Sequence, residues 1–332
     1  MEKIAFISGG TFIYWSSIIM VLAVTTAIAV YIAMYLGKGG KVVPLAISIP
    51  VGIVVSAVLG RLIHWYCCTD QYSSFGAAMT DYSSGSYALM GAFIGCLLVA
   101  CLLRLLGISK NLPQMLDCMV IGGGAGIAVG RLASMFNASA RGIVLGDYVG
   151  MPYAFPVTNA VTGVSENRLA SFMLQSVLAG AIVVMLLCYM LWCAIKKKKI
   201  KDGDICLLFL SAYGASQILM DSTRYDSLFL RANGFVSIVQ ILGAVALALA
   251  VIIFSVRLMK NRKMKFWYVP VWLVILALLG VAGYMEYYVQ RHGDQAQFAY
   301  SLMSASLLVI VLMTQVIRGV GSRQGKGIAK QS

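Results

Sequence analysis

The sequence predicts an all-α membrane protein, a polytopic bundle of about nine transmembrane helices. Two observations predict this class. Of the 332 residues, 60% are hydrophobic and only 11% are charged, whereas soluble domains carry charge on about a quarter of their residues. The mean hydropathy is +0.86, and the apolar residues fall in long runs. A run of about 20 apolar residues is what a helix needs to cross the hydrocarbon core of a bilayer.

Nine segments have this length. They are Thr11 to Leu36, Val43 to Tyr66, Tyr87 to Leu106, Gln114 to Phe136, Ala170 to Ile195, Asp204 to Asp221, Phe235 to Arg257, Phe266 to Gln290 and Phe298 to Ile317. An odd number of crossings puts the two termini on opposite sides of the membrane. No positively charged stretch precedes the first segment and no small-residue cleavage site follows it, so we expect a retained helix rather than a signal peptide.

The charged loops predict the orientation, because Lys and Arg next to a span resist translocation. Alternate connections hold 18 of the 26 Lys and Arg residues, namely Lys38 and Lys41, Arg104 and Lys110, Lys196 to Lys199 with Lys201, five between Arg257 and Lys265, and four between Arg318 and Lys330. We expect these loops in the cytoplasm, the N-terminus outside and the C-terminus inside. The formal net charge of +14 then follows from topology and from attraction to anionic lipids, and no nucleic acid partner is needed to explain it.

The sequence predicts neither a metal site nor another cofactor. The eight cysteines lie mostly within apolar runs, where a thiol behaves as a small hydrophobic group. No CxxC pair occurs, and the only two histidines, His64 and His292, are far apart in the chain. This spacing does not suggest a metal site.

Ionisable residues inside spans are costly in lipid and normally mark a functional interior. In the predicted orientation Arg61 and His64 end the second span, Arg131 ends the fourth and Glu286 ends the eighth, all on the outer side. An arginine near a helix end can also extend its guanidinium to the membrane interface without any other role. For Arg61 both explanations are open.

A polar stripe follows the sixth span. Tyr213, Gln217, Asp221 and Arg224 are separated by four, four and three positions, a spacing that places residues on one face of a helix. Because polar groups cannot face lipid cheaply, we expect this stripe to face inward, towards Arg131. The positive charge there would keep the Asp221 carboxylate ionised.

The fourth predicted span contains a glycine repeat, and a long loop follows it. Gly122, Gly126 and Gly130 repeat every four residues, which predicts close packing between helices rather than a phosphate-binding loop. About 30 residues separate Asn137 from Arg168. An external loop of this length in a membrane protein is usually functional.

The segment Gly130 to Asn137 (GRLASMFN) resembles the signature of the prolipoprotein diacylglyceryl transferase family, in which Gly-Arg, a hydrophobic residue, Gly-Asn, two hydrophobic residues and Asn close the fourth helix. Further segments resemble the family in the same order: Gly60-Arg61-Leu62, Ser86 to Gly95, Tyr213-Gly214 followed by Asp221 and Arg224, and Gly234 to Ser237 followed by Gln240 to Leu242. The resemblance implies a seven-helix transferase-like domain at residues 1–258 with the external loop 137–168. Two additional helices and a basic tail would occupy residues 259–332.

The sequence also departs from the family pattern. The third-helix histidine, proposed as the base in the family, aligns with Met90. A second functional arginine aligns with Gln217, the glutamate one turn later is the shorter Asp221, and the first asparagine of the signature is Ser134. Glu166 could replace the missing base if the external loop folds over the site.

The resemblance implies transfer of a diacylglyceryl group from phosphatidylglycerol, or another anionic phospholipid, to the lipobox cysteine in the signal peptides of prolipoproteins, at the outer face of the bacterial inner membrane. This chemistry needs a cation on the leaving phosphate and a route to a thiolate. We expect Arg131, as a bidentate phosphate ligand, and Asp221 to be the catalytic residues. The expected substrate-binding residues are Arg61, Asn137, Tyr213, Gln217, Arg224 and Gln240.

Two other functions are open at this point. One is a catalytically degenerate paralogue that binds phospholipid or a lipoprotein partner. The other is a lipid transporter, which would need polar residues through the whole membrane depth, whereas the first, fifth and ninth spans offer little beyond Ser and Thr. Asp117, in the inner half, is expected instead in the first turn of the fourth helix, where the helix dipole stabilises it.

Overall fold

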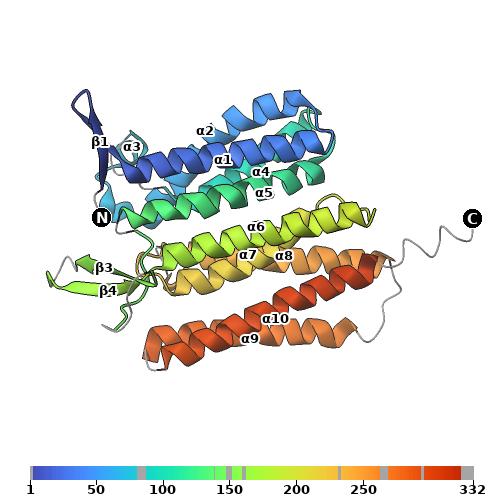
Figure 1. The fold of residues 1–332 in the computed structure, drawn as a ribbon. Coiled ribbons are helices and arrows are strands. Elements are labelled where there is room, and N and C mark those ends of the chain that lie inside the picture. The colour runs from blue at the N-terminus through green and yellow to red at the C-terminus, as the bar shows by residue number, and fades with distance from the viewer. Residues whose placement is uncertain are drawn as a thin grey trace, which may run out of the picture. The chain divides into compact units, whose positions relative to one another are not determined.

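A computed structural model describes residues 3–80, 87–137, 139–146, 152–158, 162–230, 233–261, 268–292 and 295–322. In this part of the chain eight helices are long and apolar enough to cross a membrane, and a shorter apolar helix accompanies them. Figure 1 shows these helices. The predicted class, a polytopic all-α membrane protein, is confirmed.

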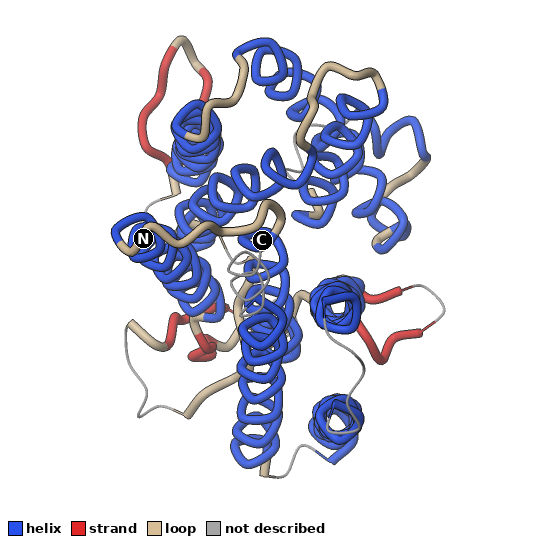
Figure 2. The backbone as a smooth tube through the Cα atoms, turned by 90° about the vertical axis from the view of Figure 1, so that its right-hand side faces the viewer, coloured by secondary structure: helices blue, strands red, loops and turns tan. Residues whose placement is uncertain are grey.

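The helices are α1 (Trp15–Gly37), α2 (Val42–Cys67), α3 (Phe75–Thr80), the shorter apolar α4 (Leu89–Leu105), α5 (Leu112–Gly130), α6 (Ser171–Ile195), α7 (Asp204–Ser222), α8 (Ile238–Asn261), α9 (Tyr268–His292) and α10 (Ala296–Ser322). Two single 3₁₀ turns, η1 (Thr69–Gln71) and η2 (Arg131–Met135), follow α2 and α5. The strands pair as β1 (Ile4–Ser8) with β2 (Thr11–Tyr14), β3 (Ala154–Thr158) with β4 (Ser165–Leu169) and β5 (Phe229–Leu230) with β6 (Asn233–Ser237). Figure 2 shows them as short segments outside the helices.

The first helix begins later than predicted. Thr11 to Tyr14 form β2 instead of the first helical turn, so α1 starts at Trp15. The reason lies in Gly9 and Gly10, which have φ values of +55° and +81°. Two consecutive residues with positive φ form the tight turn that the right-handed twist of a hairpin favours.

The chain divides into two compact units. Unit 1 comprises residues 1–206 and 223–239, and unit 2 comprises residues 207–222 and 240–332. Unit 1 therefore holds α1 to α6, the long loop and the β5–β6 hairpin. All but the first residues of α7 lie in unit 2, together with nearly all of α8 and with α9 and α10.

Glycines bring α5 against α1 in unit 1. A Cβ atom added to Gly122 would lie 2.5 Å from the Ala27 carbonyl oxygen, and one added to Gly126 would lie 2.7 Å from Ala27 Cβ. At Gly130 the nearest atom would be Ala23 Cβ, at 3.2 Å. The repeat thus lets two helix backbones approach closely, as the sequence predicts.

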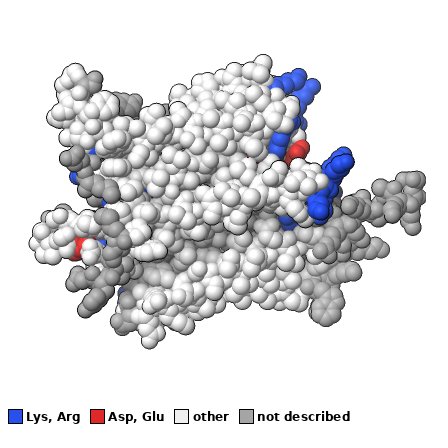
Figure 3. All heavy atoms as spheres, viewed as in Figure 1, with Lys and Arg blue, Asp and Glu red and all other residues white. Residues whose placement is uncertain are grey.

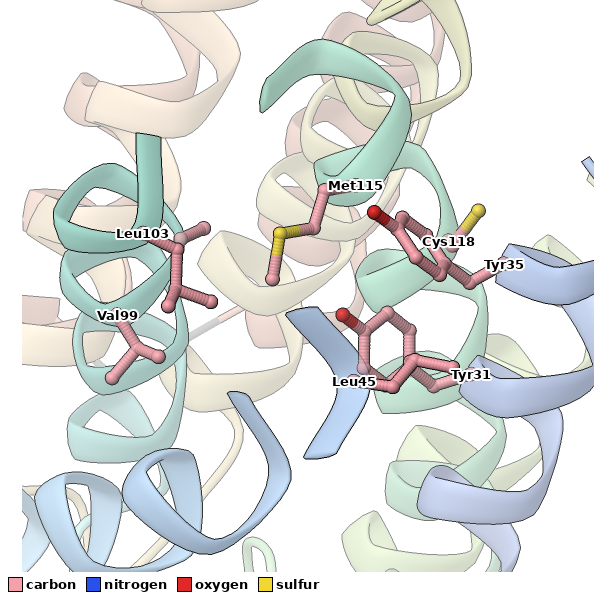
Figure 4. Packing of buried hydrophobic residues seen from close by; sticks show 8 residues of the cluster. Tyr31, Tyr35, Leu45, Val99, Leu103, Met115 and Cys118 are labelled. Atoms are coloured by element: carbon pink, nitrogen blue, oxygen red, sulfur yellow. The ribbon is translucent and has the colours of Figure 1, made fainter. Parts of the chain in front are cut away.

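An apolar cluster lies at the end of unit 1 where α1 ends and α2 and α5 begin (Figure 4). Its labelled members are Tyr31, Tyr35, Leu45, Val99, Leu103, Met115 and Cys118. Cys118 is fully buried there, which agrees with a thiol that acts as a small hydrophobic group.

Asp117 lies beside this cluster but not where the sequence predicts. It belongs to the second turn of α5, and its carboxylate accepts hydrogen bonds from the backbone N–H groups of Gly203 at 2.9 Å and Cys206 at 2.7 Å. The Lys38 ammonium lies 3.7 Å away. Asp117 therefore caps the N-terminus of α7, so the dipole that stabilises the carboxylate is that of α7 rather than that of its own helix.

Basic side chains gather at this end of unit 1, in the connections that follow α1, α4 and α6. Figure 3 shows a concentration of lysine and arginine at the right-hand end of the visible face. This is the distribution from which the cytoplasmic side is predicted, and the orientation of the termini stays a prediction.

Candidate active site

The arginine of the signature stands where α5 changes to a tighter helix. The α-helical turns of α5 end at Gly130, and Arg131 is the first residue of η2. Its side chain is partly buried. After η2, the Phe136 ring stacks on Trp15 at the start of α1, with ring centroids 6.0 Å apart. Arg131 thus lies at the end of unit 1 where α1 and α4 begin and α2 ends.

A second arginine, Arg141, holds this turn in place. Nη2 of Arg141 donates hydrogen bonds to the carbonyl oxygens of Asn137 at 3.1 Å and Met135 at 3.4 Å. The guanidinium lies 4.8 Å from the ring centroid of Phe155 and 4.5 Å from that of Phe172. Only 4% of Arg141 is exposed, and nothing in its sequence neighbourhood indicates these contacts.

Asp226 braces the same loop from the connection after α7. Its Oδ2 accepts a hydrogen bond from the Ala140 N–H at 2.8 Å, and its Oδ1 pairs with Arg224 Nη2 at 3.0 Å. Ala140 has a φ of +53°, which is uncommon for a residue other than glycine. Burial lowers the pKa of the Arg141 guanidinium below its usual value, and the charge of Asp226 opposes that shift.

Glu166 is not the free base that the sequence allows. Its Oε2 pairs with Arg168 Nη2 at 2.8 Å in strand β4. Arg168 also donates to the Gly142 carbonyl oxygen at 3.4 Å and lies 4.4 Å from the ring centroid of Tyr225. An ion pair favours the charged carboxylate and occupies one of its oxygens, so Glu166 is poorly suited to accept a proton.

Arg61 is held inside the fold. Only 3% of the residue is exposed, and its Nε donates a hydrogen bond to the Ala78 carbonyl oxygen in α3. Its guanidinium lies 5.0 Å from the ring centroid of Tyr72 and 5.5 Å from that of Tyr87. These contacts argue against an extension to the membrane interface and favour a place in the polar interior.

The polar stripe of α7 is buried in unit 2 as predicted, except at its last member. Tyr213, Gln217 and Asp221 are 4%, 1% and 1% exposed. Among the described residues neither amide atom of Gln217 has a hydrogen-bond partner. Gln240, from α8, donates to the Ile218 carbonyl oxygen at 3.4 Å, so it lies against α7.

The prediction that Arg224 continues this helical face is wrong. Helix α7 ends at Ser222, and Arg224 forms an isolated β-bridge with Gly142 in unit 1. Its side chain pairs with Asp226, two residues further on. The spacing is helical in the sequence, but the chain leaves the helix before the last position because Arg224 joins the external loop.

Two other expected site residues are placed as follows. The side-chain oxygen of Asn137 accepts hydrogen bonds from the backbone N–H and the hydroxyl of Ser139, so this exposed residue stabilises its own turn. Arg131 belongs to unit 1 and Asp221 to unit 2. Their predicted encounter at one site therefore stays a prediction, as do the roles of the other expected site residues.

Fold and site together define a class: a multi-pass helical membrane protein with buried arginines at one end of unit 1. The match with a family model is more specific. The chain belongs to the prolipoprotein diacylglyceryl transferase family, whose model matches residues 3–256. The resemblance seen in the sequence is thereby confirmed, and the matched region ends before α9 and α10.

Similar proteins carry the name phosphatidylglycerol–prolipoprotein diacylglyceryl transferase. A protein of Dehalococcoides mccartyi is 26% identical over 270 residues, which cover 79% of this chain and 96% of the relative. A protein of Clostridioides difficile is 23% identical over 249 residues, covering 74% and 92%. One from Lactococcus lactis is 25% identical over 270 residues, covering 79% and 97%. The family is thus one of transferases that act on lipid and lipoprotein.

Proposed function

We propose that the protein transfers the diacylglyceryl group of phosphatidylglycerol to the lipobox cysteine of prolipoproteins, at the outer face of the bacterial inner membrane. The observation that carries the proposal is the family match over residues 3–256, with Arg131 retained in the turn that closes α5. The basic connections at the opposite end of unit 1 support the outer face, because loops rich in Lys and Arg normally stay in the cytoplasm.

The reaction is a displacement at the glyceryl carbon that bears the phosphate. The cysteine sulfur forms a bond to this carbon, the bond from the carbon to the phosphate oxygen breaks, and glycerol phosphate leaves with the electron pair. Negative charge therefore builds up on the phosphate. A guanidinium that meets two phosphate oxygens stabilises this charge, and we assign this role to Arg131.

The remaining predicted residues would place the substrate. Asp221 would be the second catalytic residue, and Arg61 and Arg224 would add positive charge around the headgroup. Asn137, Tyr213, Gln217 and Gln240 would hydrogen-bond to the headgroup. The buried Gln217 amide has no hydrogen-bond partner among the described residues, which supports this proposal, because a buried amide normally has a partner and a ligand would supply one.

A shallow, open apolar groove at the junction of β2 and α1 is compatible with a lipid substrate. It has a volume of about 270 Å³ and is lined by Ile13 of β2 and by Ser17, Ile18, Val21 and Leu22 of α1. The start of α1 also carries Trp15, which stacks on Phe136 after η2. We propose that an acyl chain of the phospholipid lies along this groove while its headgroup reaches Arg131.

A second candidate function is phospholipid binding without turnover. It is favoured by Met90, which the resemblance aligns with the family histidine and which is buried in α4. A protein that holds the lipid but cannot form the thiolate would bind and not transfer.

The test is transfer from radiolabelled phosphatidylglycerol to a synthetic lipobox peptide by the purified protein in lipid nanodiscs. We expect thioether-linked product, and a loss of rate of about 100-fold or more in Arg131→Lys, because an ammonium cannot form the bidentate pair. Arg104→Lys is the matched control, since Arg104 is exposed at the opposite end of unit 1. Binding of phosphatidylglycerol without any product would refute the proposal in favour of the second candidate.

A further inference from the structure

The transfer reaction needs a group that removes the thiol proton, because a free cysteine has a pKa of about 8.5 and only its thiolate is nucleophilic. The acidic residues described near Arg131 in unit 1 are poor candidates. Glu166 is paired with Arg168. Asp226 is paired with Arg224 and also accepts the Ala140 N–H. Asp70 is exposed in η1, outside the buried interior of the unit.

An imidazole lies at this end of the unit. The chain has two histidines, and His64 is in the last turn of α2 with only 9% of the residue exposed. Its Nδ1 is 2.8 Å from the Tyr72 hydroxyl oxygen, and the two rings meet edge to face with centroids 5.9 Å apart. When Nδ1–H donates to the Tyr72 oxygen, the Nε2 lone pair is left to accept a proton.

The surroundings place this imidazole beside the start of α4. The Ala88 N–H donates to the Gly60 carbonyl oxygen at 3.0 Å, and a Cβ atom added to Gly91 would overlap the backbone of Gly60. Helices α2 and α4 run antiparallel here, because Gly95 faces Ser56 just as Gly91 faces Gly60. His64 follows Gly60 by one helical turn and therefore lies about one turn beyond the start of α4, whose first turn carries Met90.

Within the described part of the chain, few charged or titratable groups lie close to His64. Arg61 of the same helix and Tyr72 of the segment after η1 lie against it, and η1 itself carries the exposed Asp70. The Tyr87 ring, just before α4, lies beside Gly60 and the Arg61 guanidinium. Helix α3 and strand β5, which also pack on α2, contain no titratable side chain. Helices α4 and α1 also pack on α2, but their titratable residues lie further from the end of α2 that carries His64. These residues are Cys96, Cys101 and Arg104 in α4 and Tyr31 and Tyr35 in α1.

We propose that His64 is the general base of the transfer reaction, an inference that rests on the proposed function. Nε2 of His64 takes the proton of the lipobox thiol as sulfur bonds to the glyceryl carbon and the phosphate oxygen leaves. The imidazolium then gives this proton to the departing phosphate monoester or to water. Tyr72 fixes the ring through Nδ1, as a third group commonly orients a catalytic base.

The test compares His64→Gln with His292→Gln in the nanodisc transfer assay, with both proteins purified through a tag that contains no histidine. His292 is a matched control, because it also ends a helix beside a tyrosine, with its ring stacked on Tyr288 at 4.8 Å, but is exposed. We expect His64→Gln to lower kcat by about 100-fold or more, the usual share of a general base, with KM for phosphatidylglycerol within about threefold. The pH dependence of kcat/KM should lose one ionisation only in this variant.

A second variant keeps the test decisive if His64→Gln does not fold. Tyr72→Phe removes the hydroxyl that holds Nδ1, so the pH midpoint of kcat/KM should move and kcat should fall, while KM stays near that of the wild type. An unchanged rate in His64→Gln, or an unchanged pH profile in a folded Tyr72→Phe protein, overturns the role of His64 but leaves the transferase proposal standing. If the wild-type protein transfers no diacylglyceryl group, both the transferase proposal and the role of His64 are refuted.

Discussion

The capping of α7 by Asp117 gives a prediction that does not depend on the proposed activity. In Asp117→Asn the side chain keeps nearly the same shape but loses its charge and one acceptor oxygen. In the wild type the Asp117 carboxylate accepts hydrogen bonds from the N–H groups of Gly203 and Cys206. The amide can accept from one of them, and its NH₂ group must face the other.

The size of the effect follows from these contacts. A hydrogen bond to a charged group contributes about 1.5–3 kcal/mol, and leaving one buried N–H without an acceptor costs about 1–3 kcal/mol. Lys38, which is 3.7 Å away and 26% exposed, adds less than about 1 kcal/mol. Part of the loss is offset, because a buried carboxylate carries a desolvation cost that the amide avoids. We therefore expect Asp117→Asn to lower the free energy of unfolding by about 2–4 kcal/mol.

The assay is equilibrium unfolding in mixed micelles with increasing dodecyl sulfate, followed by circular dichroism. Asp202→Asn is the control, because Asp202 is exposed in the same connection and accepts one hydrogen bond, from Asn111 Nδ2 at 2.6 Å. We expect a change within about 0.5 kcal/mol for the control. Equal stability of Asp117→Asn and the wild type would refute the capping argument.

Three further outcomes are expected. Gly91→Ala should lower the unfolding midpoint, because a Cβ atom there would overlap the α2 backbone. Gly123→Ala should leave the midpoint unchanged, since a Cβ atom there would have no atom within 4 Å. Equal midpoints of the two variants would contradict the close packing at Gly91. Arg141→Met should reduce transfer by about tenfold and speed amide hydrogen exchange in η2, because it removes the hydrogen bonds to two carbonyl oxygens at the end of that turn. The control Arg168→Met should leave exchange in η2 unchanged. Equal exchange rates in η2 of both variants would exclude the proposed role of Arg141 in holding this turn. Burial raises the pKa of the Cys68 thiol, so its alkylation, followed by peptide mass spectrometry, should be slower than that of free cysteine at neutral pH and rise with pH; a rate equal to that of free cysteine would contradict the burial.

Much of the fold could be predicted from the sequence because its signals are local. Hydropathy over about 20 residues marks a span wherever the rest of the chain lies, and a repeat of glycine every four residues marks a helix face. The GRLASMFN segment likewise carries the family resemblance through adjacent residues. The burial of Tyr213, Gln217 and Asp221 followed from their helical spacing.

The site depended on contacts that no local pattern contains. The Asp117 carboxylate accepts a hydrogen bond from a backbone N–H 86 positions away, at the start of α7. The prediction that the dipole of its own helix stabilises it was therefore wrong. Arg224 has helical spacing, but α7 ends before it because the loop offers a bridge at Gly142. Glu166, which the sequence allowed as a substitute base if the loop folded over the site, forms an ion pair with Arg168 within its own strand.

The sequence by itself determined that this chain crosses a membrane many times and carries an arginine in a family-specific turn. Only the tertiary structure decided that Arg141 holds the end of that turn, through two carbonyl oxygens and two aromatic rings, and that His64 contacts Tyr72. The physical reason is that the burial of apolar surface depends mainly on the composition of a segment. A hydrogen bond or an ion pair depends instead on the meeting of two particular atoms.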